Sequence, residues 1–178
     1  MDTTRTQIRE VAFPAAALAG LRRALRDEAG PLAAVHALHA AGYDAGGRLF
    51  EAFTGGGDPR SRDEHSFWRG LSDFLDRRGW GTLEHSVPHP GIGLLSSPDW
   101  AEALPEGSEH QPACAFGSGL LSSVLSRAAD GPVAVLEVAC RSRGDDRCTF
   151  AFGSEAAVHE LYGLLLEGRD LDRALAEL

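Results

Sequence analysis

The chain has 178 residues, 43% of them hydrophobic, and a formal net charge of −9. These values are typical of one soluble globular domain, so we expect a single domain over residues 1–178 with a loose segment at 1–12. All 17 basic residues are arginine, scattered along the chain. This excludes the basic surface that non-specific nucleic-acid binding requires. Without an apolar run of roughly 20 residues or a signal peptide, no membrane span and a cytoplasmic location are expected.

Apolar residues at helical spacing predict a helix over residues 14–28 and a longer one over 32–53. One face of the longer helix consists of Leu32, Val35, His39, Gly42, Gly46, Leu49 and Phe53. A glycine inside a helix costs about 1 kcal/mol relative to alanine. The two glycines on this face therefore indicate close approach of another helix or of a bound ligand.

The run Ser61-Arg62-Asp63-Glu64 predicts a capping box at the start of a third helix. Its apolar stripe contains Phe67 and Trp68, which are interpreted as core residues or, alternatively, as the lining of a pocket. Each alternative places large rings beside the glycines of the preceding helix.

The second half of the chain changes to a period of two. Residues 82–87 and 92–96 predict a β-hairpin, followed by a short helix over 97–104 and a polar loop to residue 111. A helix over 112–129, strands at 132–140 and 148–152, a helix capped by Ser154 and a helical tail at 170–178 complete the chain. Because β–α–β alternation is missing, we predict an α+β fold with one antiparallel sheet packed against a helical layer.

The three cysteines, Cys114, Cys140 and Cys148, cannot all pair with one another. A disulfide framework is therefore not expected, which leaves buried core thiols, a catalytic thiol or a metal site. Cys140 and Cys148 bracket a seven-residue turn and can face each other across a hairpin. Cys114 lies at a predicted helix N-terminus, where the helix dipole favours a thiolate.

Glu137 is an acidic residue in the otherwise apolar run 133–139. It is either a solvent-facing position on a one-sided sheet or a partner of the cysteines. In an ideal strand Glu137 and Cys140 point to opposite faces. Sharing one ion would require a β-bulge or a strong twist at the strand end.

These residues together resemble the 4-vinyl-reductase domain family, which includes sensory domains of bacterial regulators that respond to phenols and alkylbenzenes. The family pattern has a Cys before a Gly-x-Gly helix, then Glu-x-x-Cys, then Gly-Asp-x-x-Cys-x-Phe. Here Cys114 precedes Gly117 and Gly119, Glu137-Val138-Ala139-Cys140 follows, and Gly144-Asp145-Asp146-Arg147-Cys148-Thr149-Phe150 completes the pattern. The resemblance is closest over residues 96–152.

The resemblance implies that Cys114, Glu137, Cys140 and Cys148 bind one zinc ion. With four protein ligands the zinc would be structural, because no position is left for water. It also implies a fold like that of the TRAPP subunits, a homodimer formed through the helical layer, and a ligand pocket between helices and sheet. The phenol sensors carry an ATPase and a DNA-binding domain, which these 178 residues lack, so signalling is expected to require a partner protein.

The expected function is the binding or sensing of a small hydrophobic or aromatic molecule. Alternatives are a dimerising scaffold without a ligand, and an accessory factor or reductase of tetrapyrrole metabolism; no enzyme activity is assigned, and no catalytic residues are predicted. Phenol sensors use a pocket His and Trp. The residues predicted to line the pocket are His39, Gly42, Gly46, His65, Trp68, Trp80 and Phe116.

Overall fold

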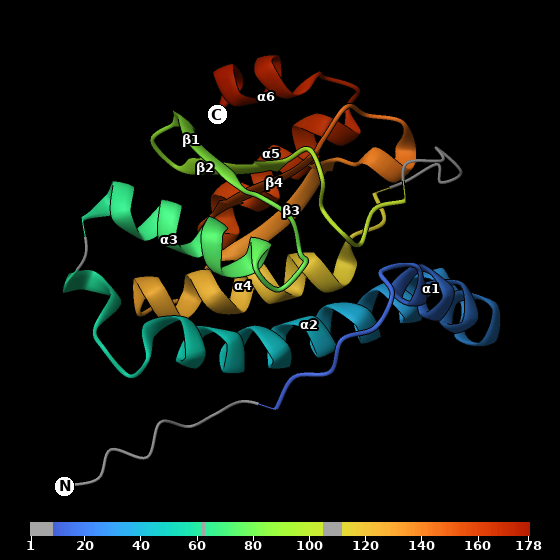
Figure 1. The fold of residues 1–178 in the computed structure, drawn as a ribbon. Helices are drawn as coiled ribbons and strands as arrows, with labels where there is room; N and C mark the ends of the chain where they lie inside the picture. Colours follow the sequence, from blue (N-terminus) through green and yellow to red (C-terminus); the bar gives the residue numbers. More distant parts are fainter. Residues whose placement is uncertain (1–8, 62, 105–111) are drawn as a thin grey trace, which may run out of the picture.

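The structure of the protein is a computed structural model that describes residues 9–61, 63–104 and 112–178. Its α-helices are α1 (Ala16–Ala29), α2 (Pro31–Thr54), α3 (Glu64–Asp76), α4 (Ala115–Ala129), α5 (Glu155–Leu166) and α6 (Leu171–Glu177). Its strands are β1 (Glu84–His89), β2 (Ile92–Ser97), β3 (Ala134–Ala139) and β4 (Cys148–Gly153), and two short 3₁₀ helices are η1 (Pro59–Ser61) and η2 (Arg141–Arg143). The predicted α+β fold is confirmed (Figure 1).

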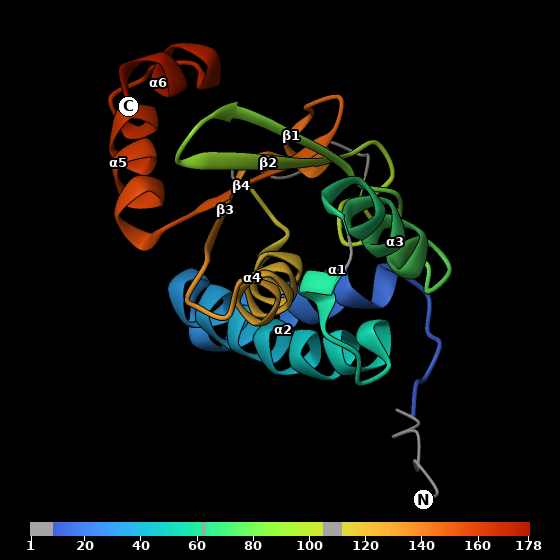
Figure 2. The same ribbon diagram turned by 90° about the vertical axis from the view of Figure 1, so that its left-hand side faces the viewer.

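The four strands form one antiparallel sheet in the order β1-β2-β4-β3. In Figure 2, α5 and α6 lie at the left of the sheet, and α4 lies below it with α2 underneath. One hydrophobic cluster, which includes Phe150 and Leu120, fills the space between the sheet and α4. A second, which includes Ala151 and Leu161, joins the opposite face to α5 and α6. Among the described residues, no helix has both the length and the hydrophobicity to cross a membrane.

Helices α2 and α4 pack against each other with their backbones in close contact. A Cβ atom on Gly42 would lie 2.0 Å from the carbonyl oxygen of Phe116, and one on Gly119 would lie 2.0 Å from that of His39. Real Cβ atoms do not approach so closely, so neither position accepts a side chain. The glycines of α2 are therefore explained by a neighbouring helix, one of the two causes proposed for them.

The start of α3 differs from the predicted capping box. The N-cap is Asp63, whose side chain accepts the backbone N–H of Ser66 at 2.9 Å. Ser61 belongs to η1, and its hydroxyl donates to the carbonyl of Asp58 at 2.7 Å. The capping prediction is wrong because Ser61 is used in the preceding turn and a better acceptor lies two residues later.

The predicted short helix at 97–104 is also wrong, because tertiary contacts hold this segment as an irregular connection. Asp99 Oδ1 accepts the backbone N–H of Thr82 at 2.9 Å, and the N–H of Ala101 donates to the carbonyl of Trp80 at 2.9 Å. Trp100 is fully buried in the cluster between the sheet and α4. These contacts with the segment before β1 replace intrahelical hydrogen bonds.

The predicted apolar face of α2 is correct only in its second half. Gly42, Gly46 and Phe53 are buried, whereas Leu32 and Val35 are exposed. In the first turns the buried positions are instead Ala34 and Leu38. Residues 9–12 form no helix or strand; residues 1–8 of the predicted loose segment and the predicted loop at 105–111 lie outside the described residues.

Candidate metal centre and ligand pockets

The structure brings the four predicted ligand residues together. Cys114 is the N-cap residue of α4, Glu137 lies in β3, Cys140 follows β3, and Cys148 begins β4. One donor atom from each lies within 4.8 Å of all the others, and the Cys114 Sγ lies 3.9 Å from the Sγ of Cys140 and of Cys148. Tetrahedral zinc with Zn–S bonds of about 2.3 Å separates its sulfur ligands by about 3.8 Å. The cluster therefore has the spacing of a zinc site.

A bulge in β3 resolves the conflict of strand parity at Glu137. The pairing of β3 with β4 shifts register between Glu137 and Ala139. An irregularity of this kind lets residues of opposite parity turn towards one side. Glu137 is consequently only 8% exposed and faces the thiols, which excludes the solvent-facing alternative.

The two oxygens of Glu137 have different surroundings. Oε2 accepts the backbone N–H of Cys114 at 2.8 Å. Oε1 is buried and has no hydrogen-bond partner among the described residues. A buried carboxylate oxygen without a partner is costly, and a cation between the thiols and Oε1 would remove that cost. The donor set of three sulfurs and one oxygen fits zinc.

The cluster concentrates acidic groups in a place that water does not reach. Burial raises the pKa of the Cys114 thiol well above its ordinary value. Burial, and then the neighbouring Cys140, raise the pKa of the Glu137 carboxyl. Hydrogen bonds from Cys114 and Cys148 lower the pKa of the Cys140 thiol. A divalent cation would supply the positive charge that allows all four groups to ionise.

A second glutamate lies beside the cluster and was not predicted from the sequence. Glu102 is 2% exposed, and its carboxylate accepts the backbone N–H groups of Phe116 at 3.0 Å and of Gly117 at 2.6 Å. Burial raises the pKa of Glu102 to about 7, against the lowering effect of these hydrogen bonds. An acidic residue two positions after a tryptophan was the available signal, but the contact with α4 is tertiary.

An aromatic-lined pocket lies between α3, the end of α4 and the sheet. This apolar pocket has a volume of about 480 Å³. Its lining residues are Pro59, Glu64, Phe67, Trp68, Leu125, Ala128, Ala129, Val133 and Phe152. Of the residues predicted for the ligand pocket, Trp68 is the one that lies here, and the sequence analysis did not assign Phe152 to it.

Trp68 and Glu64 also border a more polar outer cleft, which contains the predicted residue His65 and, in addition, His85. The ring of His85 stacks on Trp68 with centroids 3.9 Å apart and planes inclined by 16°. Its Nδ1 lies 4.0 Å from Glu64 Oε1, while burial lowers the pKa of His85. His85 is thus a polar group next to the apolar pocket that sequence reasoning interpreted only as a strand residue.

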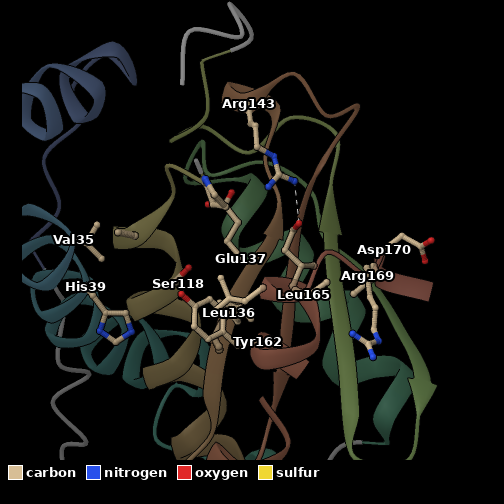
Figure 3. A pocket seen from close by; sticks show the side chains of 16 residues that line it. Val35, His39, Ser118, Leu136, Glu137, Arg143, Tyr162, Leu165, Arg169 and Asp170 are labelled. Atoms are coloured by element: carbon tan, nitrogen blue, oxygen red, sulfur yellow. Dashed lines mark hydrogen bonds between the residues drawn. The ribbon is translucent and has the colours of Figure 1, made fainter. Parts of the chain in front are cut away.

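His39 lies at a third site, a groove along the outer edge of β3 (Figure 3). The groove has a volume of about 670 Å³, with α2 and the start of α4 on one side and α5 on the other. Glu137 and Tyr162 also line it, and Arg143 at one end donates to the carbonyl of Val138 at 3.1 Å. His39 is therefore separated from Trp68, and the structure does not gather the predicted pocket residues at one site.

The remaining predicted pocket residues have packing roles. The Trp80 ring stacks on Phe116 with centroids 5.6 Å apart and planes inclined by 6°, against the main core. A Cβ atom on Gly46 would lie 2.4 Å from the carbonyl oxygen of Leu120, which resembles the contact already described for Gly42. The space that a ligand would need at both glycines is occupied by the backbone of α4.

Comparison with known proteins identifies the segment that holds the metal centre. Residues 100–154 match the vinyl-4-reductase domain. This matched segment contains all four residues of the cluster and Glu102. The predicted resemblance to the 4-vinyl-reductase family is confirmed over this segment. An uncharacterised protein of Methanocaldococcus jannaschii is 31% identical over 80 residues, which are 45% of this chain and 42% of that protein. The chain thus aligns with about two fifths of the length of this curated relative.

Three solved structures share the fold around the matched segment. The phenol-responsive sensory domain of the transcription activator PoxR, with phenol, has a TM-score of 0.68 and 17% identity, covering 83% of this chain and 77% of that one. A vinyl-4-reductase family protein from Methanocaldococcus jannaschii has a TM-score of 0.51 and 19% identity over 81% and 83% of the two chains. A trafficking protein particle complex subunit 3 from Naegleria fowleri, covalently bound to palmitic acid, has a TM-score of 0.61 and 16% identity over 78% and 91%.

Proposed function

We propose that the protein is a zinc-stabilised module that binds a small aromatic or hydrophobic molecule in the apolar pocket and acts through a partner protein. The observation that carries this proposal is the pocket itself, which is lined by the rings of Phe67, Trp68 and Phe152. Its volume suits a ligand of one or two rings, and apolar walls with few polar groups are typical of small-molecule sites. The fold shared with a phenol-responsive sensory domain supports the same class of ligand.

The metal centre and the apolar pocket lie at opposite ends of the same two elements. Helix α4 carries Cys114 at its start and Leu125 near its end, and β4 carries Cys148 at its start and Phe152 near its end. A zinc ion bound at Cys114 and Cys148 would fix the relative position of two pocket walls. We therefore assign the zinc a structural role in support of the pocket.

A side chain added inside the pocket tests this function. Ala128 lines the pocket at the end of α4, and Ala128→Phe would place a ring in the ligand's space. We expect wild-type protein to bind phenol or toluene saturably in calorimetry, and A128F to bind at least tenfold more weakly. Binding to the folded state also raises stability, by about 2.7 kcal/mol at a ligand concentration of 100 Kd.

The matched control is Ala156→Phe, which adds the same ring at an exposed position of α5. This variant should bind the probes as the wild type does. Wild-type protein that binds neither phenol nor toluene, or an A128F variant with unchanged affinity, would contradict the assignment of the ligand to this pocket.

A further inference from the structure

The start of α4 lacks the side-chain cap that a helix normally supplies from its own N-cap residue. Cys114 occupies the N-cap position and makes no capping hydrogen bond. The first N–H groups of a helix have no intrahelical partner and require acceptors. Here two glutamates from other elements provide them, Glu137 to Cys114 at 2.8 Å and Glu102 to the next turn.

Glu102 is fixed to this turn by geometry and by burial. Its two oxygens accept separate N–H groups, from Phe116 and from Gly117. A Cβ atom on Gly117 would lie 2.9 Å from Glu102 Oε2 and 2.7 Å from Trp100 Nε1, so a side chain there would displace the carboxylate. A charged acceptor held by two N–H groups in a buried site makes strong hydrogen bonds.

The peptide before Cys114 is held from a further direction. Arg22 of α1 donates from Nη1 to the carbonyl of Ala113 at 2.8 Å. The backbone around Cys114 is therefore fixed on its N-terminal side by Arg22, at its own N–H by Glu137, and on its C-terminal side by Glu102. The direction of the Cys114 thiol depends on this turn, because its Sγ is attached to the residue that begins α4.

We propose that Glu102 is a positioning residue of the metal centre, which holds the first turn of α4 so that the Cys114 thiol points at the other three ligands. The inference rests on the metal centre of the proposed function. Glu102 is not one of the four grouped donors, and it acts through the backbone of Phe116 and Gly117. Outer partners that orient metal ligands typically change metal affinity by 10- to 100-fold when they are removed.

The test compares metal binding in the full chain with Glu102→Ala and Glu102→Gln. Titration with Co²⁺ reports the thiolate-to-cobalt charge-transfer and d–d absorption bands, and competition with a chelator gives the zinc affinity. For E102A we expect a 10- to 100-fold loss of affinity and altered d–d bands. E102Q keeps one acceptor oxygen, so it should fall between E102A and the wild type; it is also the variant that decides the test if E102A does not fold.

Asp63→Ala is the matched control, because it removes the side-chain cap of α3, a helix that carries none of the four grouped donors. It should lose stability but keep the wild-type cobalt spectrum and zinc affinity. If E102A and E102Q both match the wild type in spectrum and affinity, Glu102 is only a structural cap and this inference is wrong. If the wild type itself binds neither ion, the proposed metal centre fails, and the inference fails with it.

Discussion

Glu137 gains its chemical role from two contacts that differ between its oxygens. Oε2 is engaged by the backbone N–H of Cys114, and the buried Oε1 has no partner among the described residues. The nearby thiols share the same shortage of positive charge. At the scale of single residues, the cluster is therefore best stabilised by a divalent cation that contacts all four side chains.

Cys140→Ser should abolish stoichiometric zinc. The hydroxyl that replaces the fully buried Sγ is a much poorer zinc ligand, so we expect the affinity to fall by more than about 100-fold, beyond the effect of an outer partner. The thermal midpoint should fall too, because the energy of metal binding contributes to folding. Elemental analysis and calorimetry measure the two effects. Glu84→Gln, which removes an exposed ion pair with Arg147, is the control and should keep one zinc per chain.

Helices α2 and α4 are the elements whose packing leaves least freedom for substitution. Their closest approach is made by glycines on both helices, where a Cβ atom added to Gly42 or Gly119 would lie 2.0 Å from a carbonyl oxygen of the other helix. Because α4 also begins at Cys114, its position on α2 affects the metal centre and one wall of the apolar pocket. The glycines of α2 thus support function through helix packing and not through ligand contact.

Gly42→Ala should destabilise the protein although alanine favours helix formation by about 1 kcal/mol. The added methyl group would overlap the carbonyl oxygen of Phe116, and overpacking of this kind costs about 1–3 kcal/mol or more. Gly20→Ala in α1 is the matched control, because a Cβ atom there would contact nothing within 4 Å. Urea unfolding should show G20A equal to or more stable than the wild type; equal stability of G42A and G20A would contradict the close packing.

The whole molecule leaves large apolar side chains exposed on its helical layer. Leu32 is 68% exposed, and Val35 and Tyr43 follow on the same side of α2 at helical spacing. Leu21 on α1 is exposed as well. Apolar surface of this extent is typical of a protein–protein interface, which supports the proposal of a homodimer formed through α1 and α2.

The double variant Leu32→Glu/Val35→Glu should convert the dimer into a monomer, because it would bury charges in the proposed interface. Light scattering coupled to size-exclusion chromatography measures the mass directly. Val87→Glu adds a charge at an exposed apolar position of β1 and should leave the mass of a dimer unchanged. A wild-type protein that is monomeric at micromolar concentration would contradict the proposed dimer.

Much of the architecture follows from local sequence. The helical period, the strand alternation and the capping residue Ser154 predict the order of elements, and Ser154 does accept the N–H of Ala157. The motif around Cys114, Glu137, Cys140 and Cys148 also predicts the ligand set that the structure brings together. Such features are readable because propensity, periodicity and spacing act between neighbours along the chain.

Contacts between distant segments decided the rest. Whether Glu137 faces solvent or the thiols depends on a bulge in the pairing of β3 with β4, and whether Gly42 faces a ligand or a helix depends on where α4 lies. The capping of α4 by Glu102 depends on an irregular segment that local sequence predicts to be helical. The sequence by itself determined the elements and the ligand residues, whereas tertiary packing determined the pocket, because a cavity is shaped by surfaces from segments far apart in the chain.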